Sequence, residues 1–286
     1  MAESETDLRN AINDKNFDRK QLPWYQAQLA LEDISDEARR LLEEYSGIER
    51  EKVVGHVQDV RDRAFAIFPY PCLGTFRFLN LSVSSTPYYQ EVLQRVKNGE
   101  TFLDLGCCFG QELRQLAFDG APSENLYGSD LRLDFISLGY DLFLDKDKFK
   151  AHFIAADIFD PDSDLVKQLS GKVDIIYTGA FFHLFDLEQQ TQIARRVVTL
   201  LRPRPGSLIL GRQVGNVVPG HYPRRSGDGL RYRHDASTWT KLWEQVGQET
   251  GTKWKVDATL LERSSEREWR WHDDDSRLLR FAVRRE

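Results

Sequence analysis

The spacing of hydrophobic residues along the chain differs before and after residue 100. Before it, apolar residues recur three and four positions apart, which predicts one amphipathic helix between Ser35 and Gly47 and another over residues 53–64. Ser35 suits the N-cap of the first helix and Gly47 its C-terminal stop. Thr86-Pro87 predicts the N-cap and first position of a third helix. The start of the chain is therefore expected to be mainly helical.

One segment before residue 100 breaks this pattern. Residues 68–79 (Phe-Pro-Tyr-Pro-Cys-Leu-Gly-Thr-Phe-Arg-Phe-Leu) contain too much proline and glycine for a helix and too many aromatic rings for an ordinary linker. Aromatic side chains on an irregular segment suit the wall of an apolar ligand pocket. We therefore interpret residues 1–99 as a helical and aromatic lid region, distinct from a domain over residues 100–286.

From residue 100 onward, short apolar runs alternate with helical stretches. The predicted strands cover residues 101–105, 125–129, 151–156, 173–178 and 207–210. The predicted helices cover residues 111–118, 133–144, 164–169 and 187–201. Strands that recur after helices are typical of a parallel sheet in an open α/β domain. A last helix over 237–250 and two strand-like runs, 254–261 and 278–283, predict an antiparallel hairpin at the end of the sheet.

Composition and charge narrow the possible partners. The chain has 286 residues, 39 Lys and Arg against 45 Asp and Glu, and a net charge of −6, which disfavours binding to nucleic acid. No apolar run approaches the ~20 residues that span a bilayer, and the acidic start is unlike a secretory signal. The three cysteines and six histidines show no metal-ligand spacing. We expect a cytoplasmic protein with no metal, membrane or nucleic-acid partner.

The most informative motif is a glycine-rich turn at the end of the first predicted strand. The sequence Asp104-Leu105-Gly106-Cys107-Cys108-Phe109-Gly110 stands directly before a helix. Glycine permits a tight turn and a close approach of the backbone to a ligand, and the helix N-terminus adds unpaired N–H groups. The spacing differs from Gly-x-Gly-x-x-Gly, so it does not indicate a dinucleotide site.

Two acids follow this turn in an ordered way. Asp130 ends the second predicted strand, where a carboxylate can accept both hydroxyls of a ribose, and Asp157 follows the third, where it can accept from an adenine amine. Each acid alone is more often a helix N-cap. Ligands of open α/β sheets bind beyond the carboxyl ends of the strands, so the ordered combination favours a nucleoside site.

This series resembles the class I S-adenosylmethionine-dependent methyltransferases over residues 100–215. Residues 104–110 match their first motif, Asp130-Leu131 the ribose-binding acid and its neighbour, and Asp157-Ile158 the adenine-binding pair. Cys108 departs from the middle glycine of many members. The resemblance implies S-adenosylmethionine as cofactor and a Rossmann-like seven-stranded sheet with a terminal antiparallel hairpin. It implies cofactor contacts from Asp104, Gly106, Cys108, Gly110, Asp130, Leu131, Asp157, Ile158 and Thr178.

A narrower resemblance covers most of the chain. The segments Phe76-Arg77-Phe78-Leu79, Tyr140-Asp141-Leu142-Phe143 and Phe181-Phe182-His183-Leu184-Phe185-Asp186 are similar to fungal methyltransferases of meroterpenoid and related polyketide-derived metabolism, which often form methyl esters. This resemblance implies an apolar small-molecule acceptor and a homodimer. We expect the lid region to cover that acceptor and to serve it rather than the cofactor.

His183 is the candidate catalytic residue, because it follows the fourth predicted strand beside the expected nucleoside site. It could act as a base for a phenol or orient a carboxylate, or it could be a packed structural histidine. Arg77, Phe182 and Arg212 are candidate acceptor contacts, although a core ring and surface ion pairs are the plain alternatives. Arginines at 224, 225, 231 and 233 are interpreted as solvated loop residues.

The favoured function is therefore O-methylation of an apolar acceptor in fungal terpenoid or polyketide metabolism, with a carboxylate as the expected acceptor group. A phenol or alcohol acceptor is the first alternative. A protein that keeps the fold and binds the nucleoside, but acts as a cyclase or a regulatory partner, is the second. The net charge of −6 disfavours a protein or RNA substrate.

Overall fold

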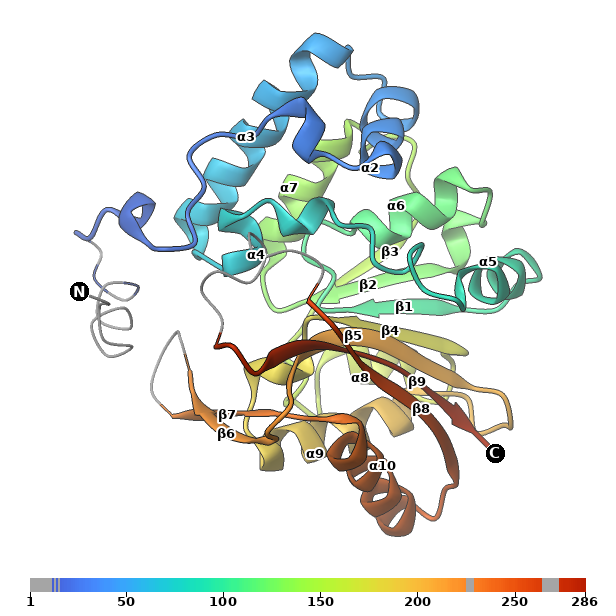
Figure 1. Cartoon of the computed structure of the whole chain (residues 1–286). Helices are drawn as coiled ribbons and strands as arrows, with labels where there is room; N and C mark the ends of the chain where they lie inside the picture. The colour runs from blue at the N-terminus through green and yellow to red at the C-terminus, as the bar shows by residue number, and fades with distance from the viewer. Residues whose placement is uncertain (1–11, 13, 15, 225–228, 264–272) are drawn as a thin grey trace. The chain divides into compact units, whose positions relative to one another are not determined.

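A computed structural model describes residues 12, 14, 16–224, 229–263 and 273–286 (Figure 1). The chain divides into two compact units. The first unit comprises residues 1–99 and 107–153, and the second comprises 100–106, 154–224 and 228–286. The acidic start of the chain, residues 1–7, lies outside the described residues. None of the described helices is both long and apolar enough to cross a membrane.

The first unit is mainly helical. Its elements are η1 (Arg19–Gln21), η2 (Leu31–Asp33), α2 (Asp36–Arg40), η3 (Leu41–Tyr45), α3 (Arg50–Ile67), α4 (Pro71–Gly74), η4 (Arg77–Leu79), α5 (Tyr89–Lys97), α6 (Gln111–Phe118), η5 (Ser123–Asn125), β2 (Leu126–Asp130) and α7 (Leu133–Phe143). The Ser35 hydroxyl accepts from the Ala38 amide and caps α2, which confirms the predicted N-cap. Helices α3 and α7 pack side by side (Figure 1).

Two details of this unit differ from the sequence prediction. The segment 68–79 contains two short helical turns, α4 and η4, because Pro71 occupies the first position of α4, where its missing N–H costs nothing. Helix α5 begins at Tyr89 rather than at Pro87, because the Thr86 hydroxyl donates back to the Val83 carbonyl and belongs to the preceding turn.

The second unit contains the remaining strands and the C-terminal helix. Its elements are β1 (Phe102–Leu105), α8 (Asp164–Leu169), β4 (Ile175–Gly179), η6 (Phe182–Leu184), α9 (Leu187–Leu200), β5 (Leu208–Asn216), β6 (Gly220–Pro223), β7 (Leu230–Arg233), α10 (Ala236–Thr250), β8 (Trp254–Leu261) and β9 (Ser276–Arg285). Strand β3 (His152–Ala155) lies at the boundary of the two units. Helix α10 lies along β8 (Figure 1).

The strands form one seven-stranded sheet in the order β3-β2-β1-β4-β5-β9-β8, and β6 and β7 form a separate hairpin. Strand β4 pairs in parallel with β1 and β5, and β9 runs antiparallel between β5 and β8. Residues such as Phe102, Ile175 and Leu208 are fully buried, as expected for parallel strands covered on both faces. The predicted α/β fold with a terminal antiparallel hairpin is confirmed.

The region after β5 differs from the prediction. Strand β5 continues to Asn216 because β9 pairs with its whole length. The glycines in this part of the sequence do not indicate that such a partner strand exists. The expected polar loop contains β6 and β7, with Arg231 and Arg233 buried. Arg233 is held by Asp273 and Ser276, so interpreting these two arginines as solvated was wrong. Residue 225 lies outside the described residues.

Candidate active site

The first unit contains the second half of the glycine-rich turn, and Asp130 holds it in place. The Cys107 amide donates to the Ser129 carbonyl, and the Cys108 amide donates to Asp130 Oδ2 at 2.9 Å. Cys108 and Gly110 both have positive φ, 51° and 65°. Cys108 therefore takes the left-handed conformation that favours glycine, although its side chain makes that conformation costly.

Asp130 keeps hydrogen-bonding capacity toward a ligand. Its Oδ1 accepts from the Arg132 amide at 3.0 Å, and its Oδ2 accepts from Cys108. A carboxylate oxygen has two acceptor positions, so each retains one for a ribose hydroxyl. Burial raises the pKa of Asp130, and the amides of Arg132 and Cys108 oppose this shift. Leu131 beside it is 62% exposed, so its side chain is open to a ligand.

The aromatic segment 68–79 packs on this same region. The Phe68 ring lies over the Arg132 guanidinium at 4.7 Å, and the Phe78 ring meets Phe109 edge-on at 5.0 Å. Burial, followed by the charge of Asp130, raises the pKa of Tyr70. The segment therefore contacts the glycine-rich turn and the turn after Asp130, which favours a role toward the cofactor.

Arg77 belongs to the same segment, residues 68–79. It lies on η4 and is half-buried. Burial raises the pKa of the Cys72 thiol to about 11, with the charge of Arg77 opposing the shift and that of Asp130 adding to it. The structure thus places Arg77 in the first unit, where its charge acts on Cys72, and its contact with an acceptor stays a prediction.

A buried ion pair supports the glycine-rich turn. Arg114 on α6 makes two hydrogen bonds to Asp145, at 2.8 and 3.0 Å, and donates to the Phe109 carbonyl at 2.7 Å. Tyr45, from η3, donates to the same carboxylate at 2.8 Å. Asp145 and Arg114 therefore connect the N-terminal helices to the glycine-rich turn through hydrogen bonds.

The second unit contains the first half of the turn and the segment after β4. Asp104 is buried in β1, opposite Tyr177 in the register. Gly106 has φ +81°, and a Cβ there would lie 2.7 Å from Phe181 Cδ2. Only glycine allows the turn to approach this ring so closely.

The predicted adenine-binding pair lies at the end of β3 in the second unit. Asp157 is exposed, and its Oδ1 accepts from the Phe159 amide at 2.9 Å. Ile158 is buried beside it. The second oxygen of Asp157 leaves room for an amine donor, so the predicted role stays open. Thr178, at the end of β4, is 1% exposed, and its contact with a cofactor stays a prediction.

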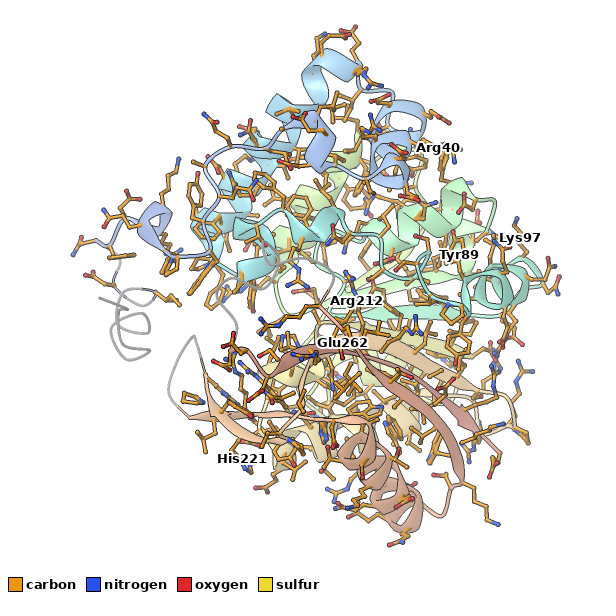
Figure 2. The ribbon with its side chains drawn as sticks, viewed as in Figure 1. Arg40, Tyr89, Lys97, Arg212, His221 and Glu262 are labelled. Atoms are coloured by element: carbon orange, nitrogen blue, oxygen red, sulfur yellow. The ribbon has the colours of Figure 1, made fainter. Side chains whose placement is uncertain are left out.

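The segment after β4 carries the candidate acceptor residues. His183 lies half-buried on η6, and Asp186 caps α9 through a reciprocal pair of hydrogen bonds with Gln189. Phe182 is fully buried, with its ring 5.1 Å from that of Trp239, so it is part of the core. The Arg212 carbonyl accepts from the Ala180 amide at 2.7 Å, which fixes Arg212 on β5 beside this segment (Figure 2).

The sequence assigned no role to two polar side chains in the second unit, Gln213 and His234. Both are 1% exposed. The sequence does not indicate that His234 is buried, because its burial depends on strand β7, which was not predicted, and on Trp239. Among the described residues, no group of three or more potential ligands could hold a metal ion.

Comparison with known proteins identifies the family. A family model described as the meroterpenoid methyltransferase N-terminal domain matches residues 24–79. The methyltransferase adrK of Penicillium roqueforti is 49% identical over 260 residues, which cover 88% of this chain and 89% of that protein. The chain belongs to the fungal meroterpenoid-type methyltransferases.

Other relatives of this meroterpenoid-type methyltransferase agree. The Asnovolin E/Chermesin D methyltransferase nvfJ of Aspergillus novofumigatus is 52% identical over 79% of this chain and 82% of that protein. The O-methyltransferase phiE of a fungal species is 47% identical over 85% of this chain and 81% of that protein. The methyltransferase domain of the bacterial CtHen1-CN structure shares the fold, with a TM-score of 0.50 and 15% identity over 73% of this chain and all of that one.

The protein is therefore an S-adenosylmethionine-dependent methyltransferase, and its residues fit that cofactor. Asp130 offers two acceptor positions, and the tight turn at Gly106 and Gly110 brings backbone close to a ligand. When bound, the cofactor supplies an electrophilic methyl group on a sulfonium. The chain needs only to hold it, orient an acceptor in line and exclude water.

Proposed function

We propose that this methyltransferase acts on oxygen and esterifies a carboxylate of an apolar, terpenoid- or polyketide-derived acceptor. Support comes from the relatives' names, which include an O-methyltransferase and a methyltransferase for Asnovolin E and Chermesin D. The observation that supports a carboxylate acceptor is the position of Arg212 on the backbone. Its carbonyl accepts a hydrogen bond from the Ala180 amide, at the start of the segment that contains His183. A guanidinium there can pair with a carboxylate.

The chemistry balances without a base. A carboxylate oxygen forms a bond to the methyl carbon while the carbon–sulfur bond breaks, and the products are a methyl ester and S-adenosylhomocysteine. A carboxylic acid, with an ordinary pKa near 4, is already ionised at neutral pH, whereas a phenol near pKa 10 benefits from a base. In this proposal His183 orients the acceptor by one hydrogen bond and transfers no proton.

A probe that carries both groups tests the proposal. Wild-type protein would be incubated with methyl-tritiated S-adenosylmethionine and an alkyl-substituted dihydroxybenzoic acid, and the product treated with mild alkali. A methyl ester releases its label as methanol, whereas an aryl ether retains it. Release of the label is expected. Retention of the label would assign the phenol as the acceptor group instead. If no labelled product forms, the acceptor must belong to a different chemical class.

His183→Ala provides a second measurement on the same probe. Losing one orienting hydrogen bond of about 1–2 kcal/mol should reduce the rate about five- to thirtyfold. Loss of a base for a phenol should instead reduce it about 10²–10⁴-fold, with a rate that rises through the histidine titration in the wild type. A wild-type rate in His183→Ala, with chemistry limiting turnover, would remove His183 from the site.

A further inference from the structure

Several polar side chains near the end of β5 are buried without a hydrogen-bond partner among the described residues. They are the Thr178 hydroxyl, both ends of the Gln213 carboxamide, His234 Nε2 and the Trp239 indole N–H. All four side chains are 1% exposed or less. Buried polar groups almost always have partners, so a cluster of unpaired ones indicates a bound molecule.

The register of the sheet places the first members on one face. Gln213 shares a face of β5 with Gly211, because side chains alternate along a strand. Gly211 pairs with Thr178 on one side and with Phe281 on the other. The Trp239 ring packs on Phe281 at 4.4 Å. Thr178 and Trp239 therefore lie on the same side of the sheet as Gln213.

His234 reaches the same face from the other direction. A Cβ on Gly215, which also shares the face of Gln213, would lie 2.5 Å from the His234 carbonyl oxygen. The His234 and Trp239 rings are 5.3 Å apart. Gln213 thus stands between two small residues of β5, with Trp239 toward one and His234 toward the other.

The hydrogen bonds of α10 determine which nitrogen of His234 carries the proton. Thr238 donates its hydroxyl hydrogen to Asp235 Oδ1 at 2.7 Å, so its oxygen can only accept from His234 Nδ1, at 3.1 Å. Nδ1 therefore carries the hydrogen. Burial lowers the pKa of His234 to about 4, which keeps the ring neutral at pH 7. Its Nε2 is then a bare acceptor that needs a donor.

The chemistry of these atoms defines the missing partner. Gln213 and Trp239 supply N–H donors, Gln213 and His234 supply acceptors, and none of the four side chains is charged at neutral pH. We propose that Gln213, His234 and Trp239 form a binding site for an uncharged hydroxyl, which donates to His234 and accepts from Gln213 or Trp239. The hydroxyl belongs either to a bound water or to the acceptor molecule, and only the second source rests on the proposed function.

The position of the cluster connects it to the acceptor segment. Thr178 is the last but one residue of β4, and the chain continues directly into Phe181, Phe182 and His183. The Phe182 ring packs on Trp239. A hydroxyl bound by Gln213 would therefore lie close to the segment that carries His183, which orients the acceptor in the proposed function.

A near-isosteric substitution tests whether the site is occupied. Gln213→Leu removes the polar atoms and keeps most of the volume. If a hydroxyl occupies the site, its hydrogen bonds are lost and Tm falls by about 2–6 °C. If nothing is bound, removing unpaired polar atoms raises Tm. Gln248→Leu, on the exposed side of α10, is the matched control and should leave Tm unchanged. Gln213→Met is a second variant should leucine prevent folding.

Two further arms identify the source of the hydroxyl. A fall in Tm without acceptor, with a water within hydrogen-bond distance of Gln213 and His234 in a crystal structure, assigns water. A rise in Tm together with an at least tenfold higher KM for the alkyl-substituted dihydroxybenzoic acid, and an unchanged cofactor Kd, assigns the acceptor. A rise in Tm with no change in KM overturns the proposal. The Tm readout needs no methyl transfer, so it stands even if the ester assay fails.

Discussion

Arg114 and Asp145 form a fully buried ion pair, and the same guanidinium holds the Phe109 carbonyl of the glycine-rich turn. Asp145 in turn accepts from Tyr45, a residue of the N-terminal helices. The turn that would hold the cofactor is thus supported by Tyr45, which lies about sixty residues before it in the sequence. Removing one member of a buried pair leaves an uncompensated charge in the core.

Arg114→Met should lower the free energy of unfolding by about 3–5 kcal/mol, because Asp145 loses its counter-charge. Denaturant unfolding measures this change. The matched control is Arg195→Met, which breaks a half-exposed pair with Glu249 and should cost no more than about 1 kcal/mol. Equal effects of the two variants would contradict the importance assigned to burial.

Asp130→Ala should weaken the affinity for S-adenosylmethionine about ten- to hundredfold, the equivalent of about 1.5–3 kcal/mol for a lost ribose acceptor. Isothermal calorimetry provides the measurement. Asp134→Ala, an exposed acid in the first turn of α7, serves as control and should bind the cofactor normally. Unchanged affinity in Asp130→Ala would show that the ribose lies elsewhere.

Cys108→Gly should raise the free energy of unfolding by up to about 1 kcal/mol, because glycine adopts the observed positive φ of 51° without strain. Cys108→Val should lower it, since a β-branched side chain suits that conformation least. Cys108→Ser retains the strain and should stay close to the wild type. A destabilised Cys108→Gly protein would mean that the cysteine side chain contributes more than its backbone costs.

Phe68→Ala should weaken cofactor affinity about two- to fivefold, because Arg132, beside Asp130, loses the ring stacked on it. Tyr25→Ala removes a similar ring from Arg61, at 4.5 Å, away from Asp130. This control should affect stability and leave cofactor affinity intact. If Phe68→Ala binds cofactor as the wild type does, this ring has no role toward the cofactor, and the acceptor role suggested by the sequence stays a prediction.

His234 should make the protein less stable in acid. Its pKa is about 4 in the folded protein and near 6.5 in the unfolded chain, so the folded state binds fewer protons between these values. Stability is therefore lost as pH falls from about 6.5 to 4, by about 3 kcal/mol in total. The free energy of unfolding, measured from pH 6.5 to pH 4, should depend less on pH in His234→Phe than in the wild type. His221→Gln, at an exposed position of strand β6, should retain the wild-type slope (Figure 2).

The sequence predicted elements best where periodicity alone determines them. Helix α6 (Gln111–Phe118) and strand β8 (Trp254–Leu261) begin and end where their hydrophobic patterns do. The glycine-rich turn and Asp130 were also identified from spacing, and the structure brings Cys108 and Asp130 together at 2.9 Å.

Features that depend on distant partners were not predictable from the sequence. Arg233 is buried because Asp273 and Ser276, some forty residues away, receive its guanidinium. The burial of His234 depends on the packing of Trp239. The end of β5 resembled a loop because Gly211 and Gly215 are poor strand formers, yet each lies where a Cβ would collide with neighbouring backbone. Local propensity cannot reveal such close approaches.

The place of β9 in the sheet has a consequence for biosynthesis. This strand, late in the chain, is inserted between β5 and β8, so on that edge of β5 Leu208 pairs with Arg284. While the ribosome is still making the residues in between, β5 has an unpaired edge, and β8 has no neighbour on the side that β9 will fill. Unpaired strand edges invite association with other chains. The nascent protein should therefore be most prone to aggregate, and most dependent on chaperones, until these last strands have left the ribosomal tunnel.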